Sequence, residues 1–229
     1  HGRGHRHSPT DVNYRANIYG MKMLGITHIV SVSAVGSLKE SMRPLDIVIP
    51  DQVYDRTTKR ASTFFDDGIV AHIGMAEPFC PNLSRILYET AARKYSAHGS
   101  GIYLCMEGPQ FSTKAESEIY RKLGFGIIGM TALPEAKLAR EAGICFAILA
   151  TITDYDVWNE EPVSIGQVMD NAAKNEEAVK DILRQSVGRI MDDDCSCRHA
   201  LAGAIATSPD AITEKTRRDL GLLINPYLK

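Results

Sequence analysis

Short apolar runs alternate along the chain with stretches in which apolar residues recur every three or four positions. The runs predict strands at residues 26–32, 46–50, 102–106, 127–131 and 144–150. The helical spacing is clearest near the start, where Val12, Ala16, Tyr19 and Met23 would share one helix face and Gly25 would end the helix. Further helices are predicted at residues 82–91, 113–123, 134–142, 164–191 and 213–220.

This order of elements predicts the fold class. Strands and helices alternate, no internal repeat is present, and no Pro-, Gly- or Ser-rich linker divides the chain. We therefore expect one α/β domain over residues 1–229, with a mixed, largely parallel central sheet flanked by helices. Residues 56–74 have little periodicity and predict a long loop, and loops of that length tend to be functional or to contact a partner.

Composition narrows the class of protein without identifying it. The chain has 229 residues, of which 44% are apolar and 24% charged, as in ordinary globular proteins. A net charge of -2 argues against a nucleic-acid or membrane-surface role, since both favour a basic excess. No apolar run approaches the roughly 20 residues that span a bilayer. The first residues contain no hydrophobic segment typical of a signal peptide, so we expect a cytoplasmic protein.

The five cysteines suggest free thiols. Cys80, Cys105 and Cys145 lie in or beside apolar segments, where a reduced cysteine behaves as a small hydrophobic residue. Cys195 and Cys197 form a Cys-Ser-Cys sequence, but no second Cys or His pair completes a strong zinc pattern. The spacing therefore predicts no metal site, and reduced thiols are the expectation inside a cell.

Polar or glycine-containing segments follow four of the predicted strands, at residues 33–36, 107–112, 130–131 and 153–156. If these strands are parallel, all four segments point into one crevice. Hydroxyls and backbone N–H groups suit a phosphate-sized anion. The aromatic ring of Phe111 suits stacking on a base, and the two carboxylates of Asp154 and Asp156 can accept from an exocyclic amine or protonate a ring nitrogen.

Structural interpretations of the same residues stay open at this point. Gly36 and Gly108 are also typical turn residues, hydroxyls often cap strand ends, and Asp154 and Asp156 suit helix or turn caps. The glycine- and histidine-rich residues 1–7 fit a plain loop as well as an anion-binding loop. The P-loop, GxGxxG and GxSxG patterns are absent from the sequence, which disfavours a nucleoside triphosphate or a dinucleotide as ligand.

Several motifs in order make the sequence resemble a known family. They are HGRGH at residues 1–5, AVGSL at 34–38, MAEPFC at 75–80, EGPQFS at 107–112, MT at 130–131 and TDYDVW at 153–158. Together they resemble the S-methyl-5′-thioadenosine phosphorylases of the purine nucleoside phosphorylase family. The resemblance extends from His1 to about the helix after Ser164, and the Cys-Ser-Cys sequence is similar to that of archaeal, heat-stable members.

The resemblance implies phosphorolysis in the nucleoside phosphorylase fold. Inorganic phosphate would attack the ribose C1′ of S-methyl-5′-thioadenosine and release adenine and 5-methylthioribose 1-phosphate. Phosphate is then a co-substrate, and no metal or organic cofactor is implied. The alternatives are a broad-specificity enzyme that accepts inosine, guanosine and adenosine, a relative that prefers methylthioinosine, and a catalytically silent nucleoside-binding subunit. The paired aspartates favour a 6-amino purine, because an ionised carboxylate repels the O6 of a 6-oxopurine.

The resemblance also implies a role for individual residues. Residues matching the phosphate site are His1, Ser33, Ala34 and Thr131. Met130 matches the ribose contact, and the purine would contact Phe111, Ser112, Thr153, Asp154, Tyr155 and Asp156. Asp154 is the expected catalytic residue, because it would hydrogen-bond or protonate N7 as negative charge builds on the leaving base.

The methylthio pocket and the subunit arrangement follow from the same resemblance. Residues matching this apolar pocket are His5, Ile165 and Val168, with Leu222 or Leu223 as candidates to close it. His72 matches a residue that a neighbouring subunit supplies, which implies a trimer or a dimer of trimers.

Two further implications concern the chain start and the cysteines. Family members carry a strand, a glycine-rich phosphate loop and an Arg before the position of His1, so a chain beginning at His1 is expected to bind phosphate poorly. Heat-stable relatives imply a Cys80–Cys145 disulfide, and Cys195 and Cys197 are candidates for oxidation as well.

Overall fold

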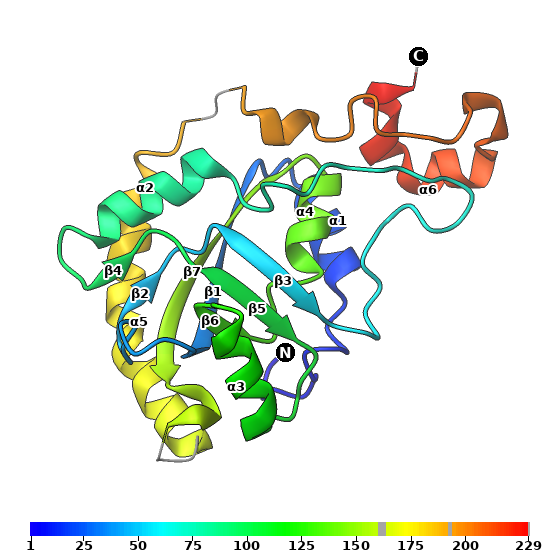
Figure 1. Ribbon diagram of the computed structural model, residues 1–229. Helices are drawn as coiled ribbons and strands as arrows, with labels where there is room; N and C mark the ends of the chain where they lie inside the picture. Colours follow the sequence, from blue (N-terminus) through cyan, green and yellow to red (C-terminus); the bar gives the residue numbers. More distant parts are fainter. Residues whose placement is uncertain (160–163, 192–193, 229) are drawn as a thin grey trace.

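The centre of the molecule is a seven-stranded sheet with the strand order β3-β5-β6-β1-β7-β2-β4 (Figure 1). The computed structural model describes residues 1–159, 164–191 and 194–228. Parallel pairing joins β1 to β7, β2 to β4, β3 to β5 and β5 to β6, whereas β1–β6 and β2–β7 are antiparallel. The expected mixed, largely parallel sheet is therefore confirmed. The strands are β1 (His28–Ser37), β2 (Ile47–Val48), β3 (Gln52–Arg56), β4 (Ala97–His98), β5 (Ile102–Met106), β6 (Ile127–Gly129) and β7 (Cys145–Asp154).

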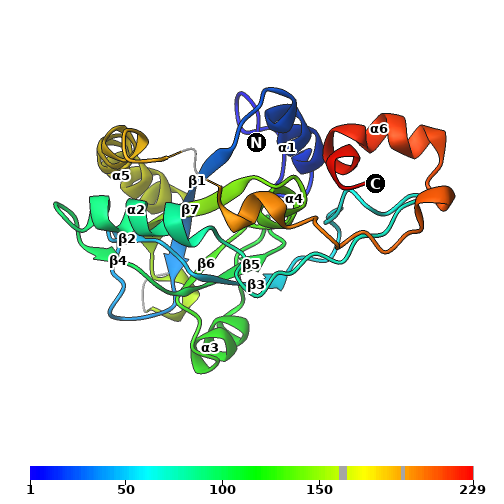
Figure 2. The ribbon, with the colours of Figure 1, turned by 90° about the horizontal axis from the view of Figure 1, so that it is seen from above.

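Helices cover the sheet on several sides, as the two orthogonal views show (Figures 1 and 2). Helices α2 and α5 pack against β7 and against each other, and α4 packs against β7 together with α1. The short helix η1 (Asp156–Trp158), which follows β7, packs against α3. The helices are α1 (Tyr14–Met23), α2 (Pro81–Ala91), α3 (Lys114–Lys122), α4 (Glu135–Glu141), α5 (Ile165–Val187) and α6 (Glu214–Ile224), with further short turns η2 (Ser196–His199), η3 (Pro209–Ala211) and η4 (Asn225–Tyr227).

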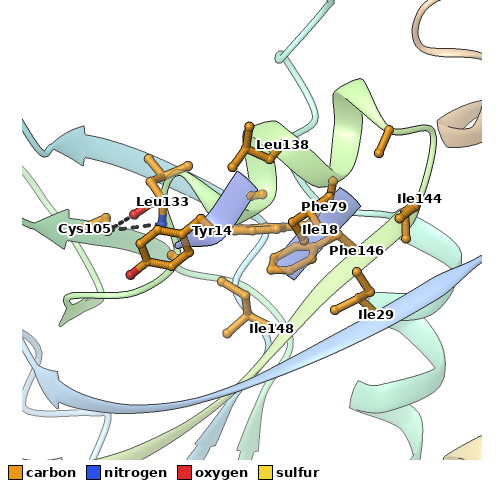
Figure 3. Close-up of a cluster of buried hydrophobic side chains, with 14 of the residues drawn as sticks. Tyr14, Ile18, Ile29, Phe79, Cys105, Leu133, Leu138, Ile144, Phe146 and Ile148 are labelled. Atoms are coloured by element: carbon orange, nitrogen blue, oxygen red, sulfur yellow. Dashed lines mark hydrogen bonds between the residues drawn. The ribbon is translucent and has the colours of Figure 1, made fainter. Parts of the chain in front are cut away.

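Strand β7 separates two hydrophobic cores. Successive side chains of a strand point to opposite faces. Phe146 and Ile148 lie in the core beneath α1 and α4, together with Tyr14 and Ile18 (Figure 3). Cys145, Ala147 and Leu149 lie in the other core, beneath α2 and α5. Because both faces are covered, all ten residues of β7 are buried, which explains its continuous apolar run.

Local signals in the sequence identified several boundaries correctly. Thr113 and Glu116 form the predicted capping box at the start of α3, and the Ser164 side chain accepts from the Gln167 N–H at the start of α5. Strand β5 has the predicted bounds. The predicted strand at 46–50 contains β2, whereas the edge strands β3 and β4 were missed, because β4 has only two residues and four of the five residues of β3 are exposed.

Two expectations about the elements were wrong in part. Val12 and Tyr19 of the expected face pack against the core, but the fully buried residues of α1 are Tyr14 and Ile18, and Ala16 and Met23 are exposed. Strand β1 does not break at residue 33 but runs to Ser37, because it pairs with β7 over most of its length and then with β6. Long-range pairing of this kind overrides the glycine and serine residues that suggested a turn.

No helix among the described residues is both long enough and apolar enough to cross a membrane.

Candidate active site

The carboxyl end of β7 holds Asp154 in a fixed orientation. The pairing of β1 with β7 shifts between Val35 and Gly36, so that Gly36 pairs with Asp154 and Thr153 is the additional residue on β7. A β-bulge of this kind re-aims the side chains that follow it. The Thr153 hydroxyl lies 2.7 Å from Oδ2 of Asp154 and 3.2 Å from the Val35 carbonyl oxygen. Oδ1 of Asp154 accepts a 2.8 Å hydrogen bond from the Asp156 backbone N–H.

Gly36 makes room for this carboxylate. A Cβ atom at position 36 would lie 2.9 Å from Oδ1 of Asp154 and 3.2 Å from Cγ2 of Ile128. Asp154 is buried, with a relative exposure of 6%. Each of its oxygens has one partner here and keeps a second lone pair for a ligand. The glycine of the AVGSL motif, which has no side chain, therefore leaves the space that the Asp154 carboxylate occupies.

Asp156 is the second buried carboxylate of the predicted pair. Its backbone has a φ of 52°, in the left-handed region, and its Oδ2 accepts a 2.5 Å hydrogen bond from the Ser117 hydroxyl of α3. Burial raises the pKa of Asp156, and the nearby Asp154 charge raises it further, while Ser117 opposes the rise. Ser117 thus holds Asp156 against α3, and Asp156 stays protonated to a higher pH than an exposed aspartate does.

The only tryptophan of the chain fixes the turn after β7. Nε1 of Trp158 donates a 2.7 Å hydrogen bond to the Ser37 carbonyl oxygen, and the Arg121 guanidinium lies over the indole ring at 3.5 Å from its centroid. The Tyr155 ring meets the indole edge-on. Residues 153–158 are therefore anchored at both ends, which keeps the two aspartates in place.

A second polar group gathers around the buried hydroxyl of Tyr103 on β5. Ser33 Oγ of β1 lies 2.9 Å from this hydroxyl, and Thr131, just after β6, approaches it with both its side chain and its backbone. Burial raises the pKa of Tyr103, so the phenol stays protonated. Gly129 is needed here, since a Cβ at that position would overlap the Tyr103 hydroxyl. Two of the predicted phosphate residues, Ser33 and Thr131, are thus brought together by a residue that was not predicted.

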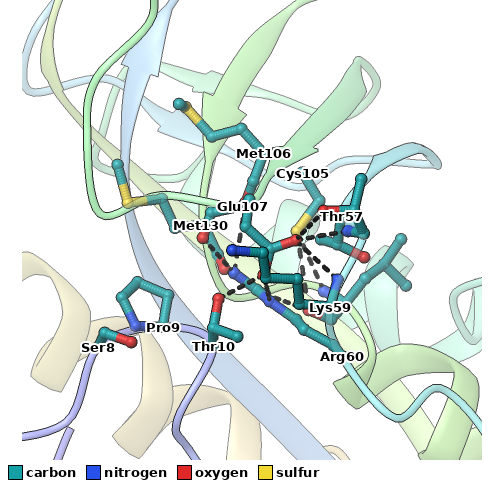
Figure 4. Close-up of polar contacts among 12 residues, drawn as sticks. Ser8, Pro9, Thr10, Thr57, Lys59, Arg60, Cys105, Met106, Glu107 and Met130 are labelled. Carbon is teal, nitrogen blue, oxygen red and sulfur yellow. Dashed lines mark hydrogen bonds and ion pairs between the residues drawn. The ribbon is translucent and has the colours of Figure 1, made fainter.

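The buried Arg60 joins the loops around Met130 (Figure 4). Only 1% of its side chain is exposed, and it donates hydrogen bonds to the carbonyl oxygens of Met130 (2.6 Å), Leu133 (2.5 Å) and Glu107 (2.6 Å). Its Nε lies 3.3 Å from Oε1 of Glu107. Arg60 therefore holds the EGPQFS loop and the Met130 loop at a fixed separation.

Glu107 carries the negative charge of this network. Burial alone would raise its pKa, but hydrogen bonds from Thr10 and from the Thr58 and Lys59 backbone N–H groups outweigh burial and lower the pKa to about 2. The carboxylate is therefore ionised at neutral pH. Through Thr10 it also connects this loop to the amino-terminal segment.

The glycine- and histidine-rich residues 1–7 form a closed loop. The His7 N–H donates to the His1 carbonyl oxygen at 3.1 Å, Nδ1 of His1 lies 2.7 Å from the His7 carbonyl oxygen, and the His1 and His5 rings stack at 4.3 Å. Pro9, just beyond this loop, packs against Gly108. The loop thus adjoins the EGPQFS segment.

The other residues matched to the purine and the methylthio pocket lie around these groups or on the helices beyond them. Phe111 is 45% exposed and so is free to meet a ligand, while Ser112 is buried with its hydroxyl 3.8 Å from Sδ of Met106. Ile165 is 74% exposed and Val168 is half-buried, both in the first turn of α5. The same helix holds β7, because Nδ2 of Asn171 donates to the Thr153 carbonyl oxygen at 2.7 Å.

His72, Leu222 and Leu223 are not brought to this group of residues by the contacts of the chain. His72 is exposed, and its backbone N–H donates to the Ala204 carbonyl oxygen, next to the bridge between Ala71 and Ile205. Leu223 is buried in the main core, and Leu222 is 41% exposed on α6.

The reason for expecting one crevice was partly wrong. Strands β1 and β7 run opposite to β5 and β6, so the four segments do not share one end of a parallel sheet. They come together because β1 is long enough to pass from β7 to β6. Ser33 and Gly36 lie three residues apart on β1, or roughly 10 Å, which leaves the Ser33–Thr131 group and Asp154 separated along one strand.

Comparisons with known proteins place the chain in a class. The profile of the phosphorylase superfamily matches residues 3–188, so the chain belongs to that superfamily. The S-methyl-5′-thioadenosine phosphorylases of Geobacter sulfurreducens and Koribacter versatilis are 52% and 50% identical to it. These alignments cover 100% and 99% of this chain, and 82% and 79% of the relatives. Within the superfamily, the chain belongs to the S-methyl-5′-thioadenosine phosphorylases.

Solved structures agree with this assignment. The crystal structure of a methylthioadenosine phosphorylase from an antarctic soil metagenomic library matches with a TM-score of 0.92 at 47% identity, over 98% of this chain and 81% of the other. Methylthioadenosine phosphorylase from Schistosoma mansoni in complex with adenine matches with a TM-score of 0.82 at 33% identity, over 98% and 81%. The nucleoside phosphorylase fold expected from the sequence is confirmed.

Proposed function

We propose that this chain catalyses the phosphorolysis of S-methyl-5′-thioadenosine to adenine and 5-methylthioribose 1-phosphate. The observation that carries the proposal is the placement of two different polar groups along β1. Ser33 and Thr131 meet at Tyr103, and Asp154 lies about 10 Å further along the strand, at Gly36. That separation suits a phosphate at one end and a purine at the other, with the ribose between them.

Each group has a defined chemical task. Neutral hydroxyls and backbone N–H groups bind phosphate without neutralising the oxygen that attacks C1′, so Ser33, Ala34 and Thr131, with His1, serve as the phosphate site. As the C1′–N9 bond breaks, the bonding electrons move to the purine and the ribose becomes oxocarbenium-like. Asp154, having taken up a proton from solvent, donates it to N7 and becomes a carboxylate, so the base leaves in its neutral form. Met130 contacts the ribose, held by Arg60 through its carbonyl oxygen.

The preference for adenine rests on Asp154, the first of the two aspartates. Once its proton has passed to N7, the Asp154 carboxylate accepts hydrogen bonds and donates none, so it suits the 6-amino group and repels a 6-oxo group. Both oxygens of Asp154 already accept from Thr153 and Asp156, which fixes the carboxylate plane before substrate binds. Phe111, exposed and adjoining Ser112, covers the purine face.

We further propose that a second subunit completes the site, in a trimer or a dimer of trimers. His72 is exposed on the long loop after the edge strand β3, where it is free to reach a neighbouring subunit. Ile165, Val168 and His5 then line the apolar side of the methylthio pocket. Light scattering of the purified protein tests the assembly, and His72→Ala raises KM for the methylthio substrate if His72 crosses between subunits.

We also propose a cytoplasmic location and a reaction without a metal or organic cofactor, in which phosphate is the second substrate. The decisive measurement is adenine release from S-methyl-5′-thioadenosine with and without phosphate. Release that depends on phosphate and survives exhaustive chelation supports the proposal. If no adenine appears at any phosphate concentration, the chain binds nucleosides without cleaving them.

A further inference from the structure

Four cysteines from three separate segments meet in the core beneath α2 and α5. Cys80, Cys145, Cys195 and Cys197 are all buried, and their Sγ atoms all lie within 4.8 Å of one another. Among the residues that the structure describes, this is the one group of three or more His, Cys, Asp or Glu side chains with metal-ligand spacing. The fifth cysteine, Cys105, is apart from the group and contacts Leu133.

The sulfur positions match those of a tetrahedral tetrathiolate site. Zinc–sulfur bonds are about 2.3 Å long, which places the sulfurs of a tetrahedral site about 3.8 Å apart. Sγ of Cys80 lies 3.7 Å from Sγ of Cys195, and the widest separation in the group is at most 4.8 Å. Bringing the four sulfurs onto one ion therefore requires shifts of less than about 1 Å.

Positive charge surrounds the four sulfurs. Nη1 of Arg140 donates to Sγ of Cys197 at 3.4 Å. Cys80 is the N-cap residue of the 11-residue helix α2, so the positive end of the helix dipole faces its sulfur. A tetrathiolate zinc site carries two negative charges, and burial makes such charge costly unless it is compensated. Arg140 and the start of α2 supply that compensation.

A path from solvent leads to the group. A cavity of about 190 Å³ is lined by Cys80 and Cys195 together with Asn82, Arg85 and Arg189. Two of the four cysteines therefore border a cavity through which a hydrated ion can approach the group. The rest of the group is enclosed by apolar side chains such as Ile47, Leu87 and Leu149.

We propose that Cys80, Cys145, Cys195 and Cys197 bind one zinc ion as a structural tetrathiolate site. On binding, each thiol loses its proton to solvent and its sulfur forms a bond to Zn²⁺, and no electron is transferred. The closed, four-sulfur set leaves no position for a substrate, so the site is structural. It lies at the opposite end of β7 from Asp154, nine residues or roughly 30 Å along the strand.

The zinc ion would fasten the carboxy-terminal part of the chain to the sheet. Cys195 directly precedes η2 and Cys197 lies within it, Cys145 is the first residue of β7, and Cys80 precedes α2. The sequence spacing pointed away from zinc because the four ligands are spread over 118 positions and only Cys195 and Cys197 are close neighbours. The same four residues were the disulfide candidates. Two disulfides require an oxidant that removes four electrons, whereas zinc binding requires none.

The experiment is metal and thiol analysis of the full chain, purified without added metal or oxidant. The expected result is one zinc per chain by elemental mass spectrometry, with the same stoichiometry in the native mass spectrum. Mercurial reagent should release the zinc, and a strong chelator should lower Tm. Cys145→Ser and Cys197→Ser should each lower the bound zinc at least fivefold, whereas the matched variant Cys105→Ser should retain it.

The wild-type measurements keep the proposal falsifiable if a variant does not fold. A denatured mass that is lower by two hydrogens for each disulfide, without bound zinc, overturns the proposal in favour of oxidation. Five reactive thiols on unfolding, with less than about a tenth of a zinc per chain, overturn it as well, and so does one iron per chain in place of zinc. None of these outcomes affects adenine release, so the test is independent of the proposed reaction.

Discussion

Asp154→Asn tests how the site selects its base. The substitution keeps the size of the side chain, and the surroundings determine which way the new amide points. Oδ1 accepts from the Asp156 backbone N–H, so the amide oxygen must take that position. The NH₂ group then takes the place of Oδ2 and faces the Thr153 hydroxyl, which can accept from it while donating to the Val35 carbonyl oxygen at 3.2 Å. The variant should therefore fold with a Tm close to that of the wild type.

The effect on catalysis should be large and should depend on the base. Position 154 loses an acceptor for the 6-amino group and presents an N–H to it, and an unsatisfied polar group in a buried site costs about 2–3 kcal/mol. Since each 1.36 kcal/mol is a factor of ten, kcat/KM for S-methyl-5′-thioadenosine should fall roughly 30- to 150-fold. A 6-oxopurine also loses the proton donor to N7 but gains a donor for O6, so kcat/KM for the corresponding inosine compound should fall much less.

The assay is phosphate-dependent base release from the 6-amino and the 6-oxo substrate, measured for each protein under the same conditions. The matched control is Asp156→Asn, which makes the same chemical change two residues away. There the Ser117 hydroxyl already donates a hydrogen bond to the carboxylate. Its specificity ratio should change much less. If Asp154→Asn loses the same factor on both substrates, Asp154 has a structural role and the reasoning about base selection is refuted.

Three further changes test the supports of the site. Gly36→Ala places a Cβ 2.9 Å from Oδ1 of Asp154 and should lower kcat/KM at least tenfold. In the control Gly20→Ala, the added Cβ in α1 meets nothing within 4 Å, so this variant should keep its activity and have a higher Tm. Equal activity of the two variants would contradict the role of Gly36. Arg60→Ala removes the donor to the carbonyl oxygens of Met130, Leu133 and Glu107 and the ion-pair partner of the part-buried Glu107 carboxylate, so it should destabilise the protein by about 3–5 kcal/mol and raise KM. An unchanged melting curve would refute this. Asp156→Asn should become more stable relative to wild type as pH rises. In the wild type, the folded state binds the Asp156 proton more tightly than the unfolded state does. The stability of the wild type therefore falls as pH rises from the unfolded pKa near 3.8 through the raised folded pKa. Melting curves of both proteins at pH 4 and pH 7 measure this, and a difference in Tm that shrinks with pH would count against the buried-charge explanation.

Local signals were sufficient to place Asp154 at the end of a buried strand. The apolar run before Asp154 is long enough to be a buried strand, and carboxylates directly after such a strand lie at a ligand-binding edge. Capping side chains also have fixed spacing, which is why Thr113 and Ser164 identified the starts of α3 and α5. Signals of this type depend on a few neighbouring residues and not on the tertiary contacts of the rest of the chain.

The supporting residues of the site could not be predicted in this way. Arg60 lies in a segment without periodicity, and its partners Met130 and Glu107 are 70 and 47 positions away. Tyr103 reads as an ordinary apolar member of β5, although its hydroxyl joins Ser33 to Thr131. The bulge at Thr153 depends on how β7 pairs with β1 and leaves no mark in the sequence of β7 alone.

Strand β7 explains why one chain can carry a precise active site and a separate stabilising site. Because cores on both faces bury all ten of its residues, the strand is a rigid link between Cys145 at its start and Asp154 at its end. A zinc ion at Cys145 would oppose the separation of α2 and η2 from β7. It would therefore stabilise the core that packs against this face of the strand. Yet it would lie too far from Asp154 to change its charge, since roughly 30 Å exceeds the Debye length of about 8 Å severalfold. Removing zinc should consequently lower the temperature at which activity is lost while leaving kcat and base preference at low temperature unchanged.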